Sequence, residues 1–402
     1  MTIIIKKKHF RNFIMMFVFV LVCFFLYLFV FSKKDSPSNL NDNLNIASNS
    51  ESAPGLDPVS VLSDEVVPRI ATHISTPDQV KALYMSSWIA GVPSRRSKLV
   101  DIIDTTELNA VVIDIKDATG RVSFKTADPF ITELGSVENR VRDMDTFIED
   151  LHKKNIYVIG RVSVFQDSYL TSKKPEWAIT RKSDGKVWKD RKGLSFLDPA
   201  QEEVLHYTVA IAKASYAIGF DEINFDYIRY PSDGNMKDIN YKLKEGTTRS
   251  DNLEKFFSSL NSEVKKENNI ITSADVFGLT TEAKDDMGIG QIWEKIIPHF
   301  DYIAPMVYPS HYPAGQYGLK NPAANPGTVI NNSILGAIKK TEAMGLPKSK
   351  IRPWLQDFDM GATYTESLVR AQIDSSEKIG VTSWMLWDPK NVYTPKALKL
   401  QN

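Results

Sequence analysis

The chain has 402 residues, of which 43% are hydrophobic and 24% are charged, and this is the composition of an ordinary globular protein. Its 49 basic residues balance its 49 acidic residues, so general affinity for nucleic acid is not expected, because counterion release needs clustered Lys and Arg. The single cysteine, Cys23, lies near the N-terminus, which excludes disulfides, zinc–thiolate sites and cysteine nucleophiles from the remainder.

Residues 13–31 form an almost unbroken apolar run that is long enough to cross a bilayer as a helix. Four basic residues precede it, and the positive-inside rule therefore favours a cytoplasmic N-terminus. We expect residues 1–34 to be a cytoplasmic segment followed by a transmembrane signal anchor. A cleaved signal peptide is the alternative, although 29–32 (FVFS) is a poor cleavage site.

Residues 35–78 are rich in Ser, Asn, Asp and Pro and hold too few apolar side chains to form a core. We expect a disordered spacer between the lipid bilayer and a globular domain at 79–402. The anchor then leaves this domain attached to the membrane on the extracytoplasmic side.

From residue 80 onward, short β-branched runs alternate with longer amphipathic stretches. The expected strands are 81–88, 110–117, 156–165, 221–228, 270–277, 301–308, 350–358 and 380–387. The clearest expected helices are 138–154, 201–218, 253–267, 329–344 and 366–379, and Gly345 and Gly380 end the last two. This alternation predicts a parallel sheet, and eight units in this length fit an α/β fold of the closed (β/α)8 TIM-barrel type.

An open, doubly wound sheet is the competing topology, but no Gly-x-Gly-x-x-Gly sequence follows the first strand to indicate a dinucleotide-binding fold. In a barrel, the two longest insertions, 166–200 and 229–250, follow strands three and four and fall on the active-site face.

Alternation of side chains along the strands predicts an unusually polar barrel interior. In the fourth strand Ile223, Phe225 and Tyr227 share one parity and should face the helices. The residues of inward parity near the carboxyl ends of the strands are Asp114, Lys116, Arg161, Glu222, Asn224, Asp226, Asp275 and Tyr308. Buried polar groups are costly unless they are hydrogen-bonded or used in function, so this set predicts a site at the carboxyl ends of the strands.

Glycoside hydrolysis fits such a site, because it needs two carboxyl groups that flank one bond and no cofactor. A Ser-His-Asp hydrolase is disfavoured because the Gly-x-Ser-x-Gly elbow is missing, and only His311 among the histidines lies near a strand end. No His-x-x-x-His or cysteine pair indicates a metal, so we expect neither metal nor cofactor.

Aromatic side chains bind the flat apolar faces of sugars, and several lie at or just after the expected strand ends. These are Trp88, Tyr230, Tyr308, Tyr312, Trp354, Trp384 and Trp387. Trp177 and Trp188 in the first long insertion are also expected to face substrate. In the seventh strand Gln356 is expected to point inward and Asp357 to lie at the tip, as a further catalytic candidate.

Four segments, 112–117 (VIDIKD), 220–231 (FDEINFDYIRYP), 304–309 (APMVYP) and 353–358 (PWLQDF), together resemble the bacterial "putative glycosyl hydrolase" domain family. The resemblance covers about residues 80–395 and implies a TIM barrel with acids at the strand ends. It also implies Asp226 as nucleophile, Asp275 as acid/base, and Arg229 as a group that orients Asp226 or binds substrate. The fourth strand is similar to the Asp-x-Asp-x-Glu strand of family 18 chitinases, but Tyr227 and Ile228 stand where the terminal acid is expected.

The function that these patterns predict is hydrolysis of an extracellular or cell-envelope polysaccharide. The first alternative is a carbohydrate-binding barrel without catalysis, in which Lys116 and Arg161 hold the carboxylates in ion pairs. An enzyme acting on phosphorylated small molecules is a second alternative, but this chain has no glycine-rich phosphate loop. A polysaccharide deacetylase is a third, but the histidine metal ligands that it needs are missing from this chain.

Overall fold

The computed structural model describes residues 71–401. The expected signal anchor at 1–34 and the greater part of the expected spacer lie outside this range. Within it, no helix is both long enough and apolar enough to cross a membrane.

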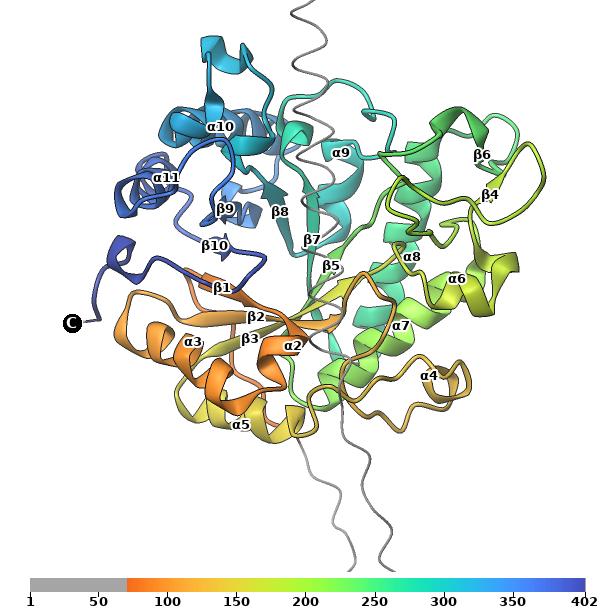
Figure 1. Cartoon of the computed structure of the whole chain (residues 1–402), viewed down its shortest axis with the longest axis horizontal. Helices are drawn as coiled ribbons and strands as arrows, with labels where there is room; N and C mark the ends of the chain where they lie inside the picture. The colour runs from red at the N-terminus through yellow and green to blue at the C-terminus, as the bar shows by residue number, and fades with distance from the viewer. Residues whose placement is uncertain (1–70, 402) are drawn as a thin grey trace, which may run out of the picture. The chain divides into compact units, whose positions relative to one another are not determined.

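Eight parallel strands close into a barrel, which confirms the predicted TIM-barrel fold (Figure 1). Around the barrel the order is β1-β10-β9-β8-β7-β5-β3-β2, so each predicted strand lies beside its neighbours in the chain and the last pairs with the first. The strands are β1 (Lys81–Met85), β2 (Ala110–Lys116), β3 (Tyr157–Ser163), β5 (Glu222–Asp226), β7 (Ile271–Phe277), β8 (Tyr302–Met306), β9 (Trp354–Gln356) and β10 (Trp384–Trp387).

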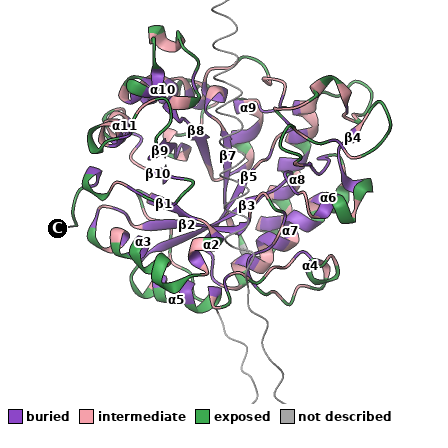
Figure 2. Cartoon of the chain, viewed as in Figure 1, coloured by how far each residue is buried: buried purple, intermediate pink, exposed green. Residues whose placement is uncertain are grey.

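Helices surround the barrel, with buried residues toward it and exposed residues on their outer faces (Figure 2). They are α2 (Ser87–Ala90), α3 (Pro93–Thr105), α4 (Pro129–Glu133), α5 (Met144–Lys153), α6 (Leu170–Lys173), α7 (Glu202–Ala217), α8 (Arg249–Asn268), α9 (Trp293–Ile296), α10 (Pro326–Ala343) and α11 (Glu366–Lys378). The five predicted helices are all present. α10 begins three residues before the predicted start because Pro326 occupies its first turn, where a missing N–H costs nothing.

Strand parity divides the core into two layers, as the sequence pattern predicts. Val111 and Ile113 of β2 pack outward against the helices, whereas Ala110 and Val112 of the same strand pack inside the barrel. The interior cluster is small, because polar side chains occupy the inward positions toward the carboxyl ends of the strands.

The two long insertions pair with each other through a two-stranded antiparallel sheet of β4 (Thr180–Arg181) and β6 (Ile239–Asn240). Trp188 is 1% exposed in this region and donates from its Nε1 to the carbonyl of Asn235 at 3.0 Å. Trp177 is buried as well. The expectation that these two tryptophans face substrate is therefore wrong, because Trp188 packs against the second insertion and Trp177 packs near Phe130 of α4.

The end of the expected spacer lies against the barrel. The backbone N–H of Ile74 donates to Asp221 at 2.8 Å, and the hydroxyls of Thr76 and Tyr157 are 2.9 Å apart. Because Asp221 immediately precedes β5, these contacts are on the side of the barrel opposite the carboxyl ends of the strands.

Candidate active site

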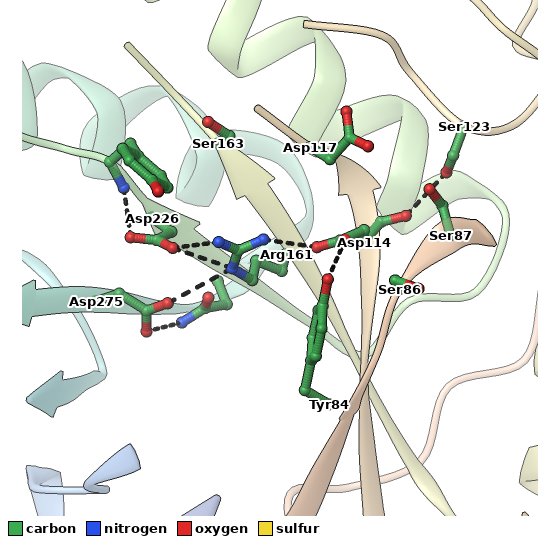
Figure 3. A network of polar contacts seen from close by, with 12 residues as sticks. Tyr84, Ser86, Ser87, Asp114, Asp117, Ser123, Arg161, Ser163, Asp226 and Asp275 are labelled. Atoms are coloured by element: carbon green, nitrogen blue, oxygen red, sulfur yellow. Dashed lines mark hydrogen bonds and ion pairs between the residues drawn. The ribbon is translucent and has the colours of Figure 1, made fainter. Parts of the chain in front are cut away.

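Three charged side chains meet at the carboxyl ends of adjacent strands (Figure 3). Asp226 ends β5, Asp275 lies on the neighbouring strand β7, and Arg161 lies on β3 on the other side of β5. In the β3–β5 register Ser163 is opposite Asp226, so Arg161 starts two residues below Asp226 and reaches up to it. All three side chains point inward, as their parity predicts.

The guanidinium of Arg161 binds two aspartates and lies near a third. Its Nη1 donates to Asp114 Oδ1 at 2.7 Å, and its Nε donates to Asp226 Oδ2 at 3.1 Å. Nη2 donates to the same oxygen of Asp226, while Oδ1 of Asp226 accepts from the backbone N–H of Tyr227 at 2.6 Å. Asp226 thus accepts three hydrogen bonds, and the two from Arg161 are charge-assisted.

Asp275 has a different environment. Its Oδ1 accepts from Asn224 Nδ2 at 2.9 Å and from Trp354 Nε1 at 2.7 Å. Its Oδ2 lies 3.9 Å from Arg161 Nε and makes no hydrogen bond to the described residues. Burial, and then the negative charge of Asp226, raise the pKa of Asp275 well above its usual range. Two donors occupy Oδ1, so Oδ2 is the oxygen of Asp275 that has no hydrogen-bond partner among the described residues.

Both aspartates line a cavity of about 400 Å³ at the mouth of the barrel. Its polar wall consists of Arg161, Asp226, Arg229 and Asp275, together with His311. Its apolar wall includes the rings of Tyr227, Phe277, Tyr308, Tyr312 and Trp387. A cavity of this size, largely aromatic with a few convergent polar groups, is typical of a small-ligand or sugar site.

The sequence profile of a family described as "putative glycosyl hydrolase domain" matches residues 82–393, which span the barrel and every wall of this cavity. The chain belongs to this family. A search among curated proteins found no match.

Among solved structures, one with a TM-score above 0.5 shares the fold of this family member, and two others are similar at lower scores. The glycoside hydrolase domain of PgaB (BpsB) from Bordetella bronchiseptica is 12% identical, with a TM-score of 0.55 over 81% of this chain and 100% of that one. A hypothetical protein from Ruminiclostridium thermocellum is 33% identical over 52% of this chain and 98% of its own, with a TM-score of 0.44. An α-galactosidase from Thermus thermophilus is 13% identical over 82% and 61%, with a TM-score of 0.48.

Tyr227 departs from the predicted parity of the fourth strand. Its φ is +52°, a left-handed conformation that ends β5 at Asp226. The turn directs the ring of Tyr227 into the cavity instead of toward the helices, so the predicted outward orientation is wrong. It also brings the N–H of Tyr227 onto the carboxylate of Asp226.

The structure brings seven of the predicted site residues to the cavity wall, namely Asp226, Asp275, Arg161, Arg229, Tyr308, Tyr312 and Trp387. Two others lie directly behind it. Asp114 accepts from Arg161 and, at 2.5 Å, from the hydroxyl of Tyr84, and burial raises its pKa. Asn224 holds Asp275 by the hydrogen bond described above.

Glu222 lies near the start of β5 and not at the cavity. Its carboxylate accepts from Arg352 Nη1 at 2.8 Å and from Ser273 Oγ at 2.6 Å, and both Glu222 and Arg352 have 0% exposure. This pair is part of the barrel interior below the cavity. Arg352 is missing from the predicted inward set, although it lies in the expected strand 350–358 and has the parity of Gln356; in the structure it precedes β9.

Lys116 does not face the interior, and its predicted orientation is wrong. The β2–β3 register shifts between Asp114 and Lys116, so Lys116 is opposite the outward-facing Val162. Its Nζ donates to Asp167 at 2.6 Å and lies 5.2 Å from the ring centroid of Tyr207 on α7. The extra residue of a bulge reverses the parity that simple alternation gives.

Tyr230 and Trp384 belong to the outer core. Tyr230 lies three residues beyond the turn at Tyr227, and its hydroxyl accepts a hydrogen bond from Asn252 at 2.8 Å. Trp384 has the outward parity on β10, and its Nε1 donates to Glu377 of α11 at 3.3 Å. Only Trp387, three residues later, reaches the cavity from this strand.

Asp357 and Gln356 connect loops and do not line the cavity. Asp357 accepts from the backbone N–H and the hydroxyl of Thr394 at 2.9 and 2.7 Å, and burial raises its pKa to about 6. Gln356 accepts from the N–H of Ser310 at 3.1 Å and donates to the carbonyl of Phe358.

Two contacts to the acids could not be assigned from the sequence. The indole of Trp354 is the donor to Asp275, although the pattern identifies it only as an aromatic near a strand end. Tyr84 on β1 stacks on Trp387 with centroids 4.0 Å apart and donates to Asp114. Inward parity is a usable signal for both, but it does not say which neighbour a side chain meets. Among residues 71–401, no group of three His, Cys, Asp or Glu side chains is arranged to hold a metal.

Proposed function

We propose that this protein is a glycoside hydrolase that cleaves an extracellular or cell-envelope polysaccharide, with Asp226 as nucleophile and Asp275 as acid/base. The observation that carries the proposal is the contrast between two neighbouring carboxyl groups. Asp226 accepts hydrogen bonds from the guanidinium of Arg161 and from the backbone N–H of Tyr227. Burial and the charge of Asp226, by contrast, raise the pKa of Asp275. Environments that favour opposite protonation states are the requirement for acid/base chemistry with two acids.

In the first step the proton on Asp275 Oδ2 passes to the glycosidic oxygen while the bond from that oxygen to the anomeric carbon breaks. A carboxylate oxygen of Asp226 forms a bond to the same carbon, which yields a glycosyl ester and a free alcohol. In the second step Asp275, now ionised, takes a proton from water, and the resulting hydroxide displaces Asp226. The enzyme returns to its starting state and the sum is hydrolysis.

We expect retention of configuration, because the two acids lie closer together than most of the range of inverting enzymes. Asp226 Oδ2 and Asp275 Oδ2 lie 3.1 and 3.9 Å from the same atom, Arg161 Nε, so they are at most about 7 Å apart. Inverting enzymes hold their acids about 6.5–9.5 Å apart to admit a water, and retaining enzymes about 5–5.5 Å apart. Proton NMR of the first sugar released tests this, and a product of inverted anomeric configuration contradicts it.

A sugar ring is proposed to lie against Trp387 and Tyr308, which flank the acids in the cavity. Trp387 is held rigidly, because it stacks on Tyr84 at 4.0 Å and meets Trp354 edge-on at 5.6 Å. Rigid aromatic faces bind sugars at little cost in conformational entropy.

One observation favours the alternative of a binding barrel without catalysis. Arg161 satisfies both Asp114 and Asp226 with ion pairs, as an inert polar network does. Asp275 favours the enzyme over the binding barrel. It is a buried carboxyl with a raised pKa and an oxygen free toward the cavity, which a binding protein does not need.

The location of the protein is part of the proposal. The apolar run at 13–31 is proposed to anchor the chain, with the barrel outside the cytoplasm, in reach of polysaccharide. If the barrel is anchored and exposed, protease added to intact cells should digest it. In untreated, lysed cells the protein should sediment with the membranes. Recovery of the protein in the soluble fraction of lysed cells contradicts the anchor.

The decisive experiment is hydrolysis of a panel of bacterial exopolysaccharides and peptidoglycan glycans by the full-length protein and its variants. Asp226→Asn and Asp275→Asn should each lower kcat by about 10²-fold or more with the fold retained. Asp357→Asn is the matched control, since this carboxyl lies outside the cavity, and it should keep most of the activity. Full hydrolytic activity in Asp226→Asn contradicts the proposed mechanism.

A further inference from the structure

Arg229 contributes to the cavity wall a guanidinium that no acidic side chain neutralises. Among residues 71–401, it is the only arginine that is not exposed and has no carboxylate within 4.0 Å. Arg161 in the same cavity, by contrast, pairs with two aspartates. A charge removed from water without a partner is costly, and proteins keep such groups mainly where they are used.

The local contacts hold Arg229 in place but leave one edge of it open. Its Nη1 donates to the carbonyl of Tyr230 at 3.0 Å and to the hydroxyl of Ser232 at 3.2 Å. Its Nε and Nη2 make no hydrogen bond to the described residues. Neither atom is among the fully buried, unsatisfied polar atoms, so both remain accessible. This pair of N–H groups is one of the two edges with which arginine binds a carboxylate bidentately.

Two aromatic rings restrict the position of this guanidinium. Its central carbon lies 4.6 Å from the ring centroid of Phe277, the last residue of β7, and 5.2 Å from that of Tyr227, which follows β5. All three residues line the cavity, so a ligand in the cavity can reach the guanidinium. Burial lowers the pKa of Arg229, which remains a cation at neutral pH.

The two arginines of the cavity wall differ in their ion pairs. Arg161 binds the carboxylates of both Asp114 and Asp226. Arg229 lines the same cavity and has no carboxylate within 4.0 Å among the described residues. The guanidinium that is left without an acidic partner is therefore that of Arg229.

We infer that Arg229 forms a subsite for a carboxylate on the sugar, so that the substrate class is an acidic glycan. The inference rests on the proposed function in one respect, because that function identifies the ligand as a glycan. It does not require that the protein hydrolyse this glycan. The carboxylate can come from a uronic acid or from a lactyl ether on an amino sugar, and either would approach the free Nε/Nη2 edge. Glycans that carry free amines should be disfavoured by the unpaired guanidinium of Arg229.

Binding measured by calorimetry with the full-length Asp275→Asn protein tests this without turnover. Asn has nearly the same size and shape as the carboxyl group, so the change should remove turnover and leave the Arg229 edge in place. The probes are oligogalacturonate, its methyl ester, peptidoglycan glycan strands freed of stem peptides, and chitosan oligosaccharides. At least one of the two carboxylated probes should bind, about 10-fold or more tighter than the ester or the amine.

The second variant, Asp275→Asn with Arg229→Gln, should remove that preference, and Arg229→Lys should restore part of it. Arg96→Gln is the matched control, because Arg96 also lies over a ring, that of Phe147, but pairs with Asp143 away from the cavity. Equal binding of acid and ester, a preference that survives Arg229→Gln, or no binding of either carboxylated probe overturns the inference. Unchanged hydrolysis by Asp226→Asn would instead overturn the proposed function and leave this preference intact.

Discussion

At the scale of single residues, Asp275 is positioned by groups that also set its protonation. Asn224 and Trp354 both donate to Oδ1, and each hydrogen bond lowers the pKa of a carboxyl that burial raises. These donors orient the acid and select the oxygen that carries the proton. They are positioning residues, since neither of them lines the cavity.

Trp354→Phe should shift the pH profile of hydrolysis. The change removes a donor to the carboxylate of Asp275, which raises the pKa of this acid further. Because the acid must be protonated to act, the alkaline limb of kcat/KM should move to higher pH, with a lower kcat. Trp384→Phe is the control, because its Nε1 donates to Glu377 outside the site, and it should leave the limb unmoved. A limb that stays in place in Trp354→Phe assigns this indole to packing alone.

Asp275→Asn should stabilise the protein at neutral pH while it removes activity. A carboxyl whose folded pKa is raised binds its proton more tightly when folded, so stability falls as pH rises from the unfolded pKa through the folded one. Asn removes this dependence, and the free energy of unfolding at neutral pH should rise by about 1 kcal/mol or more. Thermal melts at pH 4 and pH 7.5 should show the gain only at the higher pH. A variant that melts lower than wild type at pH 7.5 contradicts the direction of the pKa shift.

At the scale of elements, the insertions after β3 and β5 are joined by a tight contact. Gly234 has φ +112°, and a Cβ built there would lie 2.8 Å from the ring of Trp188. The buried indole and the β4–β6 ladder then act together to fix the two loops. Neither insertion shows this pairing in its own sequence, because each contributes a strand of only two residues.

Gly234→Ala should therefore destabilise the loops. The added methyl must displace the Trp188 ring, and together with the left-handed φ this should cost about 1–3 kcal/mol. Gly246→Ala is the matched control in the same insertion, since its φ is +76° but no atom lies within 4 Å of the added Cβ. Limited proteolysis and chemical denaturation measure the difference, and equal effects of the two changes would assign the cost to the backbone alone.

At the scale of the whole molecule, Glu222 and Arg352 join distant parts of the barrel. The two residues are 130 positions apart, and both have 0% exposure. Arg352 also stacks on Tyr302 of β8, with 4.0 Å from its central carbon to the ring centroid. The pair thereby connects β5, β8 and the start of β9 beneath the cavity.

Arg352→Met should cost about 3–5 kcal/mol in unfolding free energy, because it leaves the Glu222 carboxylate buried without its counterion. Glu222→Gln with Arg352→Met should recover much of this loss, since no uncompensated charge remains. Urea denaturation of the single and double variants measures the coupling. A double variant as unstable as the single one contradicts a charge-based cost, and lower affinity for glycan in Glu222→Gln alone would support the predicted binding role of Glu222.

The barrel itself could be predicted from the sequence, because its signal is local. Hydrophobic periodicity and helix termini depend on residues that are near one another in the chain. They predict eight strands in order and helix ends at Gly345 and Gly380, and the structure has these strands and both glycines in the left-handed conformation. The inward parity of Asp226 and Asp275 follows from the same alternation. The acids could therefore be placed together before any contact was known.

Tertiary structure alone decided the chemistry around those acids. The bulge before Lys116 and the left-handed turn at Tyr227 each reverse a side chain, and both depend on neighbouring strands and loops, not on local propensity. A pKa depends on desolvation and on the partners of a carboxyl, so the proton on Asp275 and the unpaired Arg229 have no one-dimensional signal. Alternation along a strand shows which residues face the interior, and only packing in three dimensions shows what each of them meets there.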